Sequence, residues 1–327
     1  MLVYVAAPRQ LDYGAKNMRR LSLFAWWALL AVLMLGLAGC GSGTAKGEKY
    51  IDFRKVSPVP AAVTTDAQVL RVAISSVLLP QEAVVHYRTI AAHLGAQLGR
   101  PVILIQRQSY AEIALLLLNG GADIAFFSSG EYGNYSGFDE IEMLAMQQRL
   151  GVPYYQGYLI VGQDSGINKL ADLRGKTVAF TDPLSYSGYT FLVHLLRQQN
   201  ETPEKFFGRY IYTYNHEKSF RAVANKVVDA APVTSIIYDR ALIRTPELAK
   251  AVKVIAISPQ AGIGPVVAGK SVTAEQRAVL RRTLLAMHEN PAMSAALQGL
   301  MIDKWVAPQP ELFEPIRRMV NEKRQTP

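Results

Sequence analysis

Short β-rich runs alternate with helical stretches through most of the chain, and this alternation limits the possible folds more than any other feature. The first cycle starts with the β-rich run VLRVAIS at 69–75 and continues through a helical stretch near 83–98. PVILIQ at 101–106 is the next expected strand, Tyr110–Leu118 a helix, and ADIAFF at 122–127 a third strand. This βαβαβ order predicts a mainly parallel sheet.

A second cycle of similar size follows the first. Its expected strands lie at 158–161, 176–180, 209–214, 227–233 and 253–258, and the expected helices at 169–173, 189–199, 216–225 and through Tyr238 and Leu242. The run at 253–258 is the last strand that we predict, because residues 273–289 and 291–302 have the pattern of helices. Two such cycles predict an α/β protein with two lobes and a ligand cleft between them.

An uncharged apolar run near the N-terminus predicts export. Residues 21–38 are almost wholly apolar, Arg19 and Arg20 precede them, and small residues lead to Cys40. A basic start, an apolar middle and a small-residue end form a secretory signal, and Met18 is an alternative start to Met1. A plain N-terminal membrane anchor is the alternative interpretation.

The string LAGC, which ends at Cys40, resembles the lipobox of bacterial lipoproteins. In that family the cysteine is lipidated and becomes the mature N-terminus. The resemblance implies a signal peptide over 1–39 and a lipid anchor at Cys40 that holds the protein on the membrane, facing the periplasm or the cell exterior. Residues 41–67 are small, polar and proline-bearing, so that 40–67 is expected to be the lipidated cysteine and a flexible tether.

Composition excludes several function classes. Cys40 is the only cysteine, which rules out an intramolecular disulfide and a cysteine-based zinc site. The formal net charge is +9, but the basic residues are scattered and form no stripe interleaved with aromatic side chains. Nucleic-acid binding is therefore not expected, whereas a small anionic ligand suits the charge.

The segment GKTVAFTDPLSYSGYTF at 175–191 gives the clearest indication of a ligand-binding site. A strand runs into Asp182-Pro183, and Ser185, Ser187 and Gly188 stand at the start of a helix. Serine hydroxyls, free backbone N–H groups and the positive end of the helix dipole together make an anion site, and a glycine lets the backbone approach a ligand. An ordinary capped helix remains the alternative, because serine and aspartate are favoured caps.

Four stretches in order resemble the phosphate/phosphite/phosphonate ABC-transporter substrate-binding proteins, the phosphonate-binding type of periplasmic receptor. They are SYAEI with GGADIAFFSS at 109–129, the segment from YLIVG to SGY at 158–189, YTYNHEKS to APV at 212–233, and VIAISPQAGIGPVV at 254–267. The resemblance covers roughly 69–320. It implies the type II periplasmic-binding-protein architecture, with two α/β lobes that the chain crosses twice and that close on ligand by a hinge.

The resemblance also implies domain boundaries and ligand contacts. Lobe 1 is expected at 68–157, lobe 2 at 158–253, and the return to lobe 1 with the C-terminal helices at 254–327. The ligand-binding residues that match the family are Ser185, Tyr186, Ser187, Gly188, His216, Tyr110 and Tyr155. The serines match hydroxyls that bind phosphonate oxygens, the histidine matches an anion donor, and the tyrosines at 110 and 155 match aromatic contacts.

Three positions depart from the family pattern. Tyr186 stands between the two serines, where threonine is usual, and is expected to put bulk at the mouth of the site. Gly264 stands where the family often has an acid, and a second acid of the family falls near Ser235 and Ile236, which are neutral. Such acids can accept hydrogen bonds from an ammonium group, so their absence favours a ligand without an amine.

These observations predict a lipid-anchored extracytoplasmic receptor that captures a small oxyanion for an ABC permease, as a monomer and without cofactor or metal. An extracytoplasmic sensor for a membrane signalling partner and a receptor for a sulfonate or other small ligand remain open. An enzyme on the same scaffold is not expected, because the chain has no HExxH or GxSxG motif and offers no catalytic residue.

Overall fold

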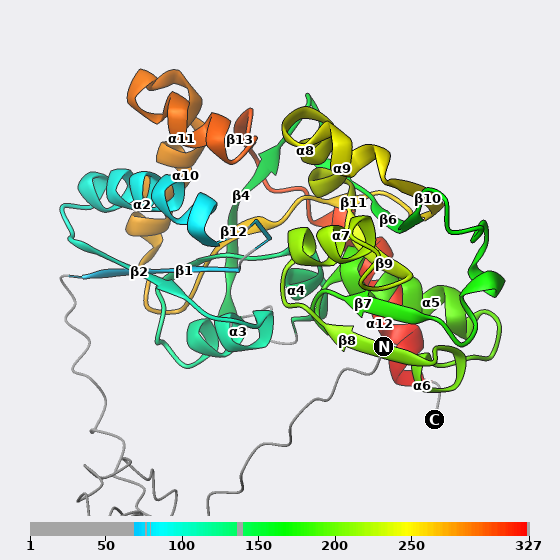
Figure 1. The fold of residues 1–327 in the computed structure, drawn as a ribbon. Helices are drawn as coiled ribbons and strands as arrows, with labels where there is room; N and C mark the ends of the chain where they lie inside the picture. The colour runs from blue at the N-terminus through cyan, green and yellow to red at the C-terminus, as the bar shows by residue number, and fades with distance from the viewer. Residues whose placement is uncertain (1–68, 76, 79, 136–139, 326–327) are drawn as a thin grey trace, which may run out of the picture. The chain divides into compact units, whose positions relative to one another are not determined.

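The computed structural model describes residues 69–75, 77–78, 80–135 and 140–325, which form two β-sheets and the helices around them (Figure 1). The expected signal peptide over 1–39, Cys40 and the tether over 40–67 lie outside the described residues. Within the described ranges, no helix combines the length and the apolar character needed to cross a membrane.

The first sheet has six strands in the order β13-β4-β12-β3-β1-β2, and we call this sheet with its helices lobe 1. Its strands are β1 Leu70–Ile74, β2 Val102–Gln106, β3 Ile124–Phe126, β4 Glu142–Gln148, β12 Pro265–Ala268 and β13 Lys304–Val306. The helices of lobe 1 are α2 Pro80–Gln97, α3 Tyr110–Leu118, α4 Ser129–Asn134, α10 Ala274–Leu285, α11 Ser294–Gly299 and α12 Glu314–Gln325. Helix α2 covers one face of β1 and β2, and α3 lies on the other (Figure 1). The expected βαβαβ order of β1, α2, β2, α3 and β3 is confirmed.

The second sheet has five strands in the order β10-β6-β9-β7-β8, and it forms lobe 2 with its helices. Its strands are β6 Gly157–Gly162, β7 Thr177–Phe180, β8 Arg209–Tyr212, β9 Ala230–Thr234 and β10 Val252–Ile257. Its helices are a π-helical turn η3 at Tyr186–Thr190 that continues into α5 Phe191–Arg197, then α6 Pro203–Phe206, α7 His216–Ala224, α8 Ser235–Arg244 and α9 Pro246–Lys250. A two-stranded ribbon of β5 Tyr154–Tyr155 and β11 Ala261–Gly262 lies where the chain passes between the sheets.

Both sheets are mixed, so the expected predominance of parallel strands is not found. Pairing is parallel in β2-β1-β3 and in β8-β7-β9, where helices connect the strands, and antiparallel at every other pair. In the first sheet the reason is the path of the chain, because β12 enters from lobe 2 without a βαβ crossover and pairs antiparallel with both β3 and β4.

The run at 253–258 is also not the last strand, since β11, β12 and β13 follow it. The expected boundary between 253 and 254 falls inside β10, which belongs wholly to the second sheet.

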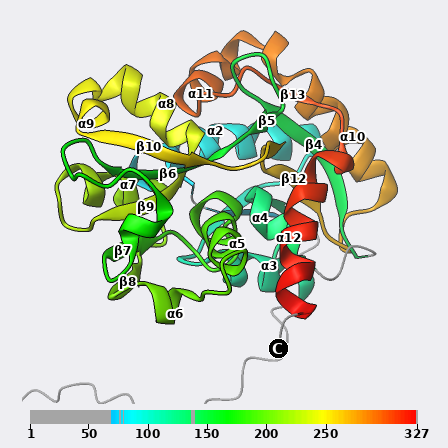
Figure 2. The ribbon, with the colours of Figure 1, turned by 90° about the vertical axis from the view of Figure 1, so that its right-hand side faces the viewer.

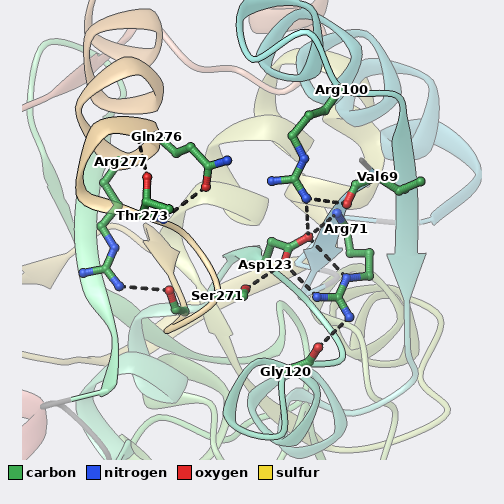
Figure 3. Close-up of polar contacts among 10 residues, drawn as sticks. Val69, Arg71, Arg100, Gly120, Asp123, Ser271, Thr273, Gln276 and Arg277 are labelled. Carbon is green, nitrogen blue, oxygen red and sulfur yellow. Dashed lines mark hydrogen bonds and ion pairs between the residues drawn. The ribbon is translucent and has the colours of Figure 1, made fainter. Parts of the chain in front are cut away.

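The buried carboxylate of Asp123 links the ends of neighbouring strands in lobe 1 by hydrogen bonds (Figure 3). Asp123, just before β3, accepts hydrogen bonds from the backbone N–H and the guanidinium of Arg71 on β1 and from the hydroxyl of Ser271 after β12. Arg100 lies 3.7 Å from the same carboxylate. Burial alone would raise the pKa of Asp123, but the hydrogen bonds from Arg71 and Ser271 outweigh it and lower that pKa.

Local signals fix where several helices begin. Ser109 caps α3 in a capping box with Glu112, and Thr273 caps α10 in the same way with Gln276. Asn215 caps α7 by accepting from the N–H groups of Glu217 and Lys218. The cap of α7 matters for the site, because it places His216 as the first residue of that helix.

Candidate functional site

A small cavity lies between residues that follow strands of both sheets. Its volume is about 40 Å³, enough for roughly three water-sized groups. Hydroxyl, amide and aromatic side chains dominate its wall, which is formed by Ser75, Val77, Leu78, Tyr87, Phe126, Phe127, Ser128, Ser129, Gly130, Gln147, Arg149, Tyr155, Ser185, Ser187, His216, Thr234, Ile236, Ile263 and Gly264. Four of the residues expected from the sequence are therefore brought together here: Ser185, Ser187, His216 and Tyr155.

Ser185 and Ser187 lie at the start of the helical segment η3–α5. Ser185 is the N-cap, and its Oγ accepts from the N–H of Gly188 at 3.0 Å. Both serines are buried within the protein and line the cavity. A hydroxyl that accepts from a backbone N–H still has its own hydrogen to donate, so both side chains can donate to an anion.

His216 is held as a neutral donor. Its Nδ1 accepts from the backbone N–H of Thr234 at 3.2 Å, and this contact leaves the ring proton on Nε2. Nε2 lies 3.3 Å from Ser185 Oγ, and His216 is one of the residues that line the cavity. Burial lowers the pKa of His216 to about 3, so the ring is uncharged at neutral pH.

Tyr155 joins the two sides of the cavity. It lies on β5, in the ribbon through which the chain passes between the sheets. Burial raises the pKa of Tyr155, and hydrogen bonds with the side chains of Ser129 in lobe 1 and Ser187 in lobe 2 partly offset this effect. The phenol is therefore neutral and is surrounded by hydroxyl groups.

The lobe 1 side of the cavity adds donors that the sequence did not single out. Ser75 follows β1, and Ser128 and Ser129 stand at the start of α4. The hydroxyl of Ser75 donates to Glu131 Oε2, which also accepts from the N–H of Ser128 at 3.1 Å. Burial and the nearby charge of Asp182 raise the pKa of Glu131 well above its usual range, although the two hydrogen bonds act against this.

Three residues expected at the site do not line the cavity. Tyr186 is fully buried, donates its hydroxyl to the carbonyl of Pro259 at 2.8 Å, and packs edge-on against Tyr155, so it does not stand at the mouth of the site. A Cβ on Gly188 would lie 2.5 Å from Thr181 and 2.9 Å from the ring of His216. The glycine is thus required by packing behind the cavity rather than by an approach to ligand.

Tyr110 also lies away from the cavity wall. Its ring is 1% exposed, and its backbone N–H donates to Asp182 Oδ2 at 3.0 Å across the two lobes. Its buried hydroxyl has no hydrogen-bond partner among the described residues. Burial, followed by the charge of Asp182, raises the pKa of Tyr110 well above its usual range.

The structure also shows the surroundings of Gly264, Ser235 and Ile236, the positions at which acids of the family are missing. Gly264 lines the cavity, and a Cβ there would lie 2.1 Å from the carbonyl oxygen of Phe127, so no side chain fits without a backbone shift. Ser235 is not part of the wall, whereas Ile236 is. No carboxylate is among the lining residues in the part of the chain that the structure describes.

Comparisons with known proteins identify the family of the chain. Residues 72–313 match the family model described as ABC transporter, phosphonate, periplasmic substrate-binding protein. The phosphonates-binding periplasmic protein of Escherichia coli (strain K12) is 29% identical over 233 residues, which are 68% of this chain and 67% of that protein. The phosphate-import protein PhnD of Mycolicibacterium smegmatis is 28% identical over 168 residues, or 48% of this chain and 52% of that protein.

Solved structures show the same fold. The binding-protein component of an ABC phosphonate transporter from Pseudomonas aeruginosa has a TM-score of 0.71 and 27% identity, covering 78% of this chain and 86% of that one. PhnD1 from Prochlorococcus marinus (MIT 9301), solved with methylphosphonate, has a TM-score of 0.69 and 14% identity over 80% of this chain and 100% of that one. The type II periplasmic-binding-protein architecture is thereby confirmed. Since the family match spans well over half of the sequence, the chain belongs to the periplasmic substrate-binding proteins of phosphonate ABC transporters.

Proposed function

We propose that this protein captures a compact oxyanion of the phosphate, phosphite or phosphonate class outside the cytoplasm and delivers it to the permease of an ABC importer. The observation that carries the proposal is the cavity wall, in which Ser185, Ser187 and the Nε2–H of neutral His216 converge without a carboxylate. Neutral donors in a dry site bind an anion strongly, because hydrogen bonds to charged groups are about twice as strong as neutral ones.

The wall also argues against a ligand with an amine. A buried ammonium group needs a carboxylate or several acceptors, and an unmatched charge costs several kcal/mol. Glu217 and Asp239, two acids of lobe 2, are not part of this wall, and Glu217 pairs with Arg221 at 2.8 Å. We therefore expect phosphite, phosphate or a short alkylphosphonate to bind better than 2-aminoethylphosphonate.

A thermal-shift screen of the purified protein tests this function. The ligands are phosphate, phosphite, methylphosphonate, 2-aminoethylphosphonate, sulfate and an alkylsulfonate. A ligand present at 100 times its Kd adds about 2.7 kcal/mol to the free energy of unfolding, so the best oxyanion should raise the melting temperature clearly. Stabilisation by sulfonate alone, or by none of these anions, would contradict the proposal.

We expect binding without chemistry on the ligand. The relatives are transport proteins, and the donors Ser185 and His216 are neutral groups in contact with each other. Phosphonates and phosphate esters incubated with equimolar protein should be recovered unchanged. Release of phosphate over many turnovers would identify an enzyme instead.

A lipid anchor at Cys40 completes the proposal, since the string LAGC ends at that residue. Cys40→Ala should abolish fatty-acid labelling of the protein in cells and either release the chain from the membrane or leave the signal segment uncleaved. Unchanged labelling in this variant would show that the protein is not anchored through Cys40.

A further inference from the structure

Arg149 is a buried cation in the cavity wall that the sequence did not reveal. Its side chain lines the same cavity as Ser185, Ser187 and His216, yet only 8% of the residue is exposed. Arg149 directly follows β4 and forms a bridge with Val152 across a tight turn. Gly151 in this turn has a φ of 79°, a conformation that glycine adopts without strain. The turn therefore fixes the backbone from which the guanidinium reaches the cavity.

Neutral groups hold this guanidinium in place. Nε and Nη2 donate to Gln147 Oε1 at 3.2 and 2.8 Å, and Nη1 donates to the carbonyl of Leu300 at 2.6 Å. A guanidinium has five N–H groups, so two of those in Arg149 have no acceptor among the described residues. Gln147, which also lines the cavity, thus orients the fork without neutralising its charge.

Among the described residues Arg149 forms no direct ion pair, in contrast to other poorly exposed arginines. Arg240, with a side chain 7% exposed, pairs with Glu82, and Arg100, with a side chain 12% exposed, lies 3.7 Å from the carboxylate of Asp123. Burial lowers the pKa of Arg149 to about 10, which still leaves it protonated at neutral pH. Tyr87 and Asp303, whose carboxylate accepts from the N–H of Gly151 in the same turn, act on Arg149 only at longer range and raise its pKa against the effect of burial. Because His216 is neutral, Arg149 is the charged side chain in the cavity wall.

A buried cation without a directly paired anion costs several kcal/mol, even where a charge at longer range offsets part of this cost. Building on the proposed function, we propose that Arg149 determines specificity at this site: it supplies the counter-charge for the oxyanion and repels ligands that carry an amine. Its two N–H groups without protein acceptors can donate to the ligand directly. The hydroxyls of Ser185 and Ser187 then bind the anion from lobe 2, and Arg149 from lobe 1.

Calorimetry with methylphosphonate and 2-aminoethylphosphonate tests the role of Arg149, because the amine distinguishes these two probes. Arg149→Gln should bind methylphosphonate at least about tenfold more weakly than the parent, as expected for loss of a buried charge partner. The preference for methylphosphonate over the amine ligand should shrink by a similar factor, because the repulsion is removed as well. Arg149→Lys keeps the charge and should keep the preference.

The matched control is Arg174→Gln, which removes the same charge from an exposed arginine paired with Glu201 in lobe 2. It should bind both probes as the parent does. A purely structural role of Arg149 predicts a lower melting temperature of Arg149→Gln without ligand and an unchanged preference between the probes. Our proposal predicts a higher melting temperature of Arg149→Gln without ligand and a smaller preference between the probes. The melting temperature rises because the glutamine removes the cost of burying an unpaired charge.

The outcomes separate this inference from the proposed function. If the parent binds neither probe nor inorganic phosphate, the proposed function fails. If the parent binds and Arg149→Gln keeps both its affinity and its preference, the function stands and the role of Arg149 is refuted. Should Arg149→Gln not fold, Arg149→Lys tests the role of the charge instead. This variant keeps the positive charge, so loss of its preference for methylphosphonate over 2-aminoethylphosphonate would overturn the proposal.

Discussion

Ser185 and Ser187 stand two residues apart at one helix start, but they differ in what else they stabilise. Ser185 caps the helix through Gly188, whereas Ser187 contacts Tyr155. Replacing either serine by alanine should weaken oxyanion binding about tenfold or more, because a hydrogen bond to a charged group contributes roughly 1.5–3 kcal/mol. Only Ser185→Ala should also lower the free energy of unfolding without ligand, by about 1 kcal/mol for the lost cap.

Calorimetry and thermal unfolding measure the two effects of the serine variants separately. Ser294→Ala, at an exposed serine in helix α11 of lobe 1, is the control and should change neither. Parent-like affinity in both Ser185→Ala and Ser187→Ala would place the anion elsewhere.

His216 should make the protein sensitive to acid. Its pKa is about 3 in the folded protein and near 6.5 when unfolded, so between these values the unfolded chain binds one proton more. Stability from this group is therefore fully present above pH 6.5 and declines by about 1.4 kcal/mol per pH unit as the pH falls toward 3. Glu131 acts in the opposite sense, because its raised pKa favours the folded state below the pKa of the unfolded carboxyl.

Comparison with His216→Gln isolates the histidine, since all other groups titrate in both proteins. Urea unfolding at pH 7, 6, 5 and 4.5 should show the parent losing stability relative to the variant at the lower pH values. A constant difference across this range would mean that His216 is accessible to protons in the folded state.

Residue types and order predicted four of the eleven polar side chains in the cavity wall. The serines of η3, His216 and Tyr155 follow recognisable strings, and all of them line the cavity. Arg149 and Gln147 were missed because nothing local marks them. They reach the cavity only through the pairing of β4 with β12 and β13 and through the tight turn after β4, which are long-range features.

At the scale of elements, the sequence predicted what local patterns determine. Helix α3 was expected at Tyr110–Leu118 and is found there, because Ser109 forms its capping box. The strands β4, β12 and β13 were not expected, and their pairing is antiparallel. Their place in the sheet depends on the pairing of β4 with β12, which returns from lobe 2, and with β13, and no local periodicity encodes this long-range pairing. Helix α12 was missed as well, and it packs beside α4 and α5 (Figure 2).

The contact between α4 and η3 gives a test at the same scale. A Cβ on Gly130 in α4 would lie 2.2 Å from the carbonyl of Leu184 and from the N–H of Tyr186, which are backbone atoms of lobe 2. Gly130→Ala should therefore push the two elements apart and weaken oxyanion binding by about tenfold, in line with the 1–3 kcal/mol cost of overpacking.

Lobe separation can relieve the clash in Gly130→Ala, so its melting temperature without ligand should change less than its affinity. Gly162→Ala is the control, because a Cβ there meets only Ser165 at 3.7 Å. Equal affinity of Gly130→Ala and the parent would show that this contact between the lobes is not needed for binding.

Polar links between the lobes connect the site to the whole molecule. Asp182 of lobe 2 accepts from the N–H of Tyr110, and Asn215 of lobe 2 donates to the carbonyl of Leu78 at 3.1 Å. Arg240 on α8 pairs with Glu82 on α2. If the oxyanion stabilises the arrangement of the lobes seen here, each link contributes to affinity by the free energy with which it favours that arrangement.

The pair of Glu82 and Arg240 is the link that can be cut with the least damage, because 46% of the Glu82 side chain is exposed. Glu82→Gln should weaken oxyanion binding by about fivefold or more, because it leaves Arg240, whose side chain is only 7% exposed, without its carboxylate partner. The effect should shrink in high salt, which screens exposed charges. Glu247→Gln is the matched control, as it removes an exposed ion pair with Lys250 inside lobe 2. Calorimetry at low and high salt compares the affinities of Glu82→Gln and Glu247→Gln. An equal change of affinity in both variants would mean that the link between the lobes has no part in binding.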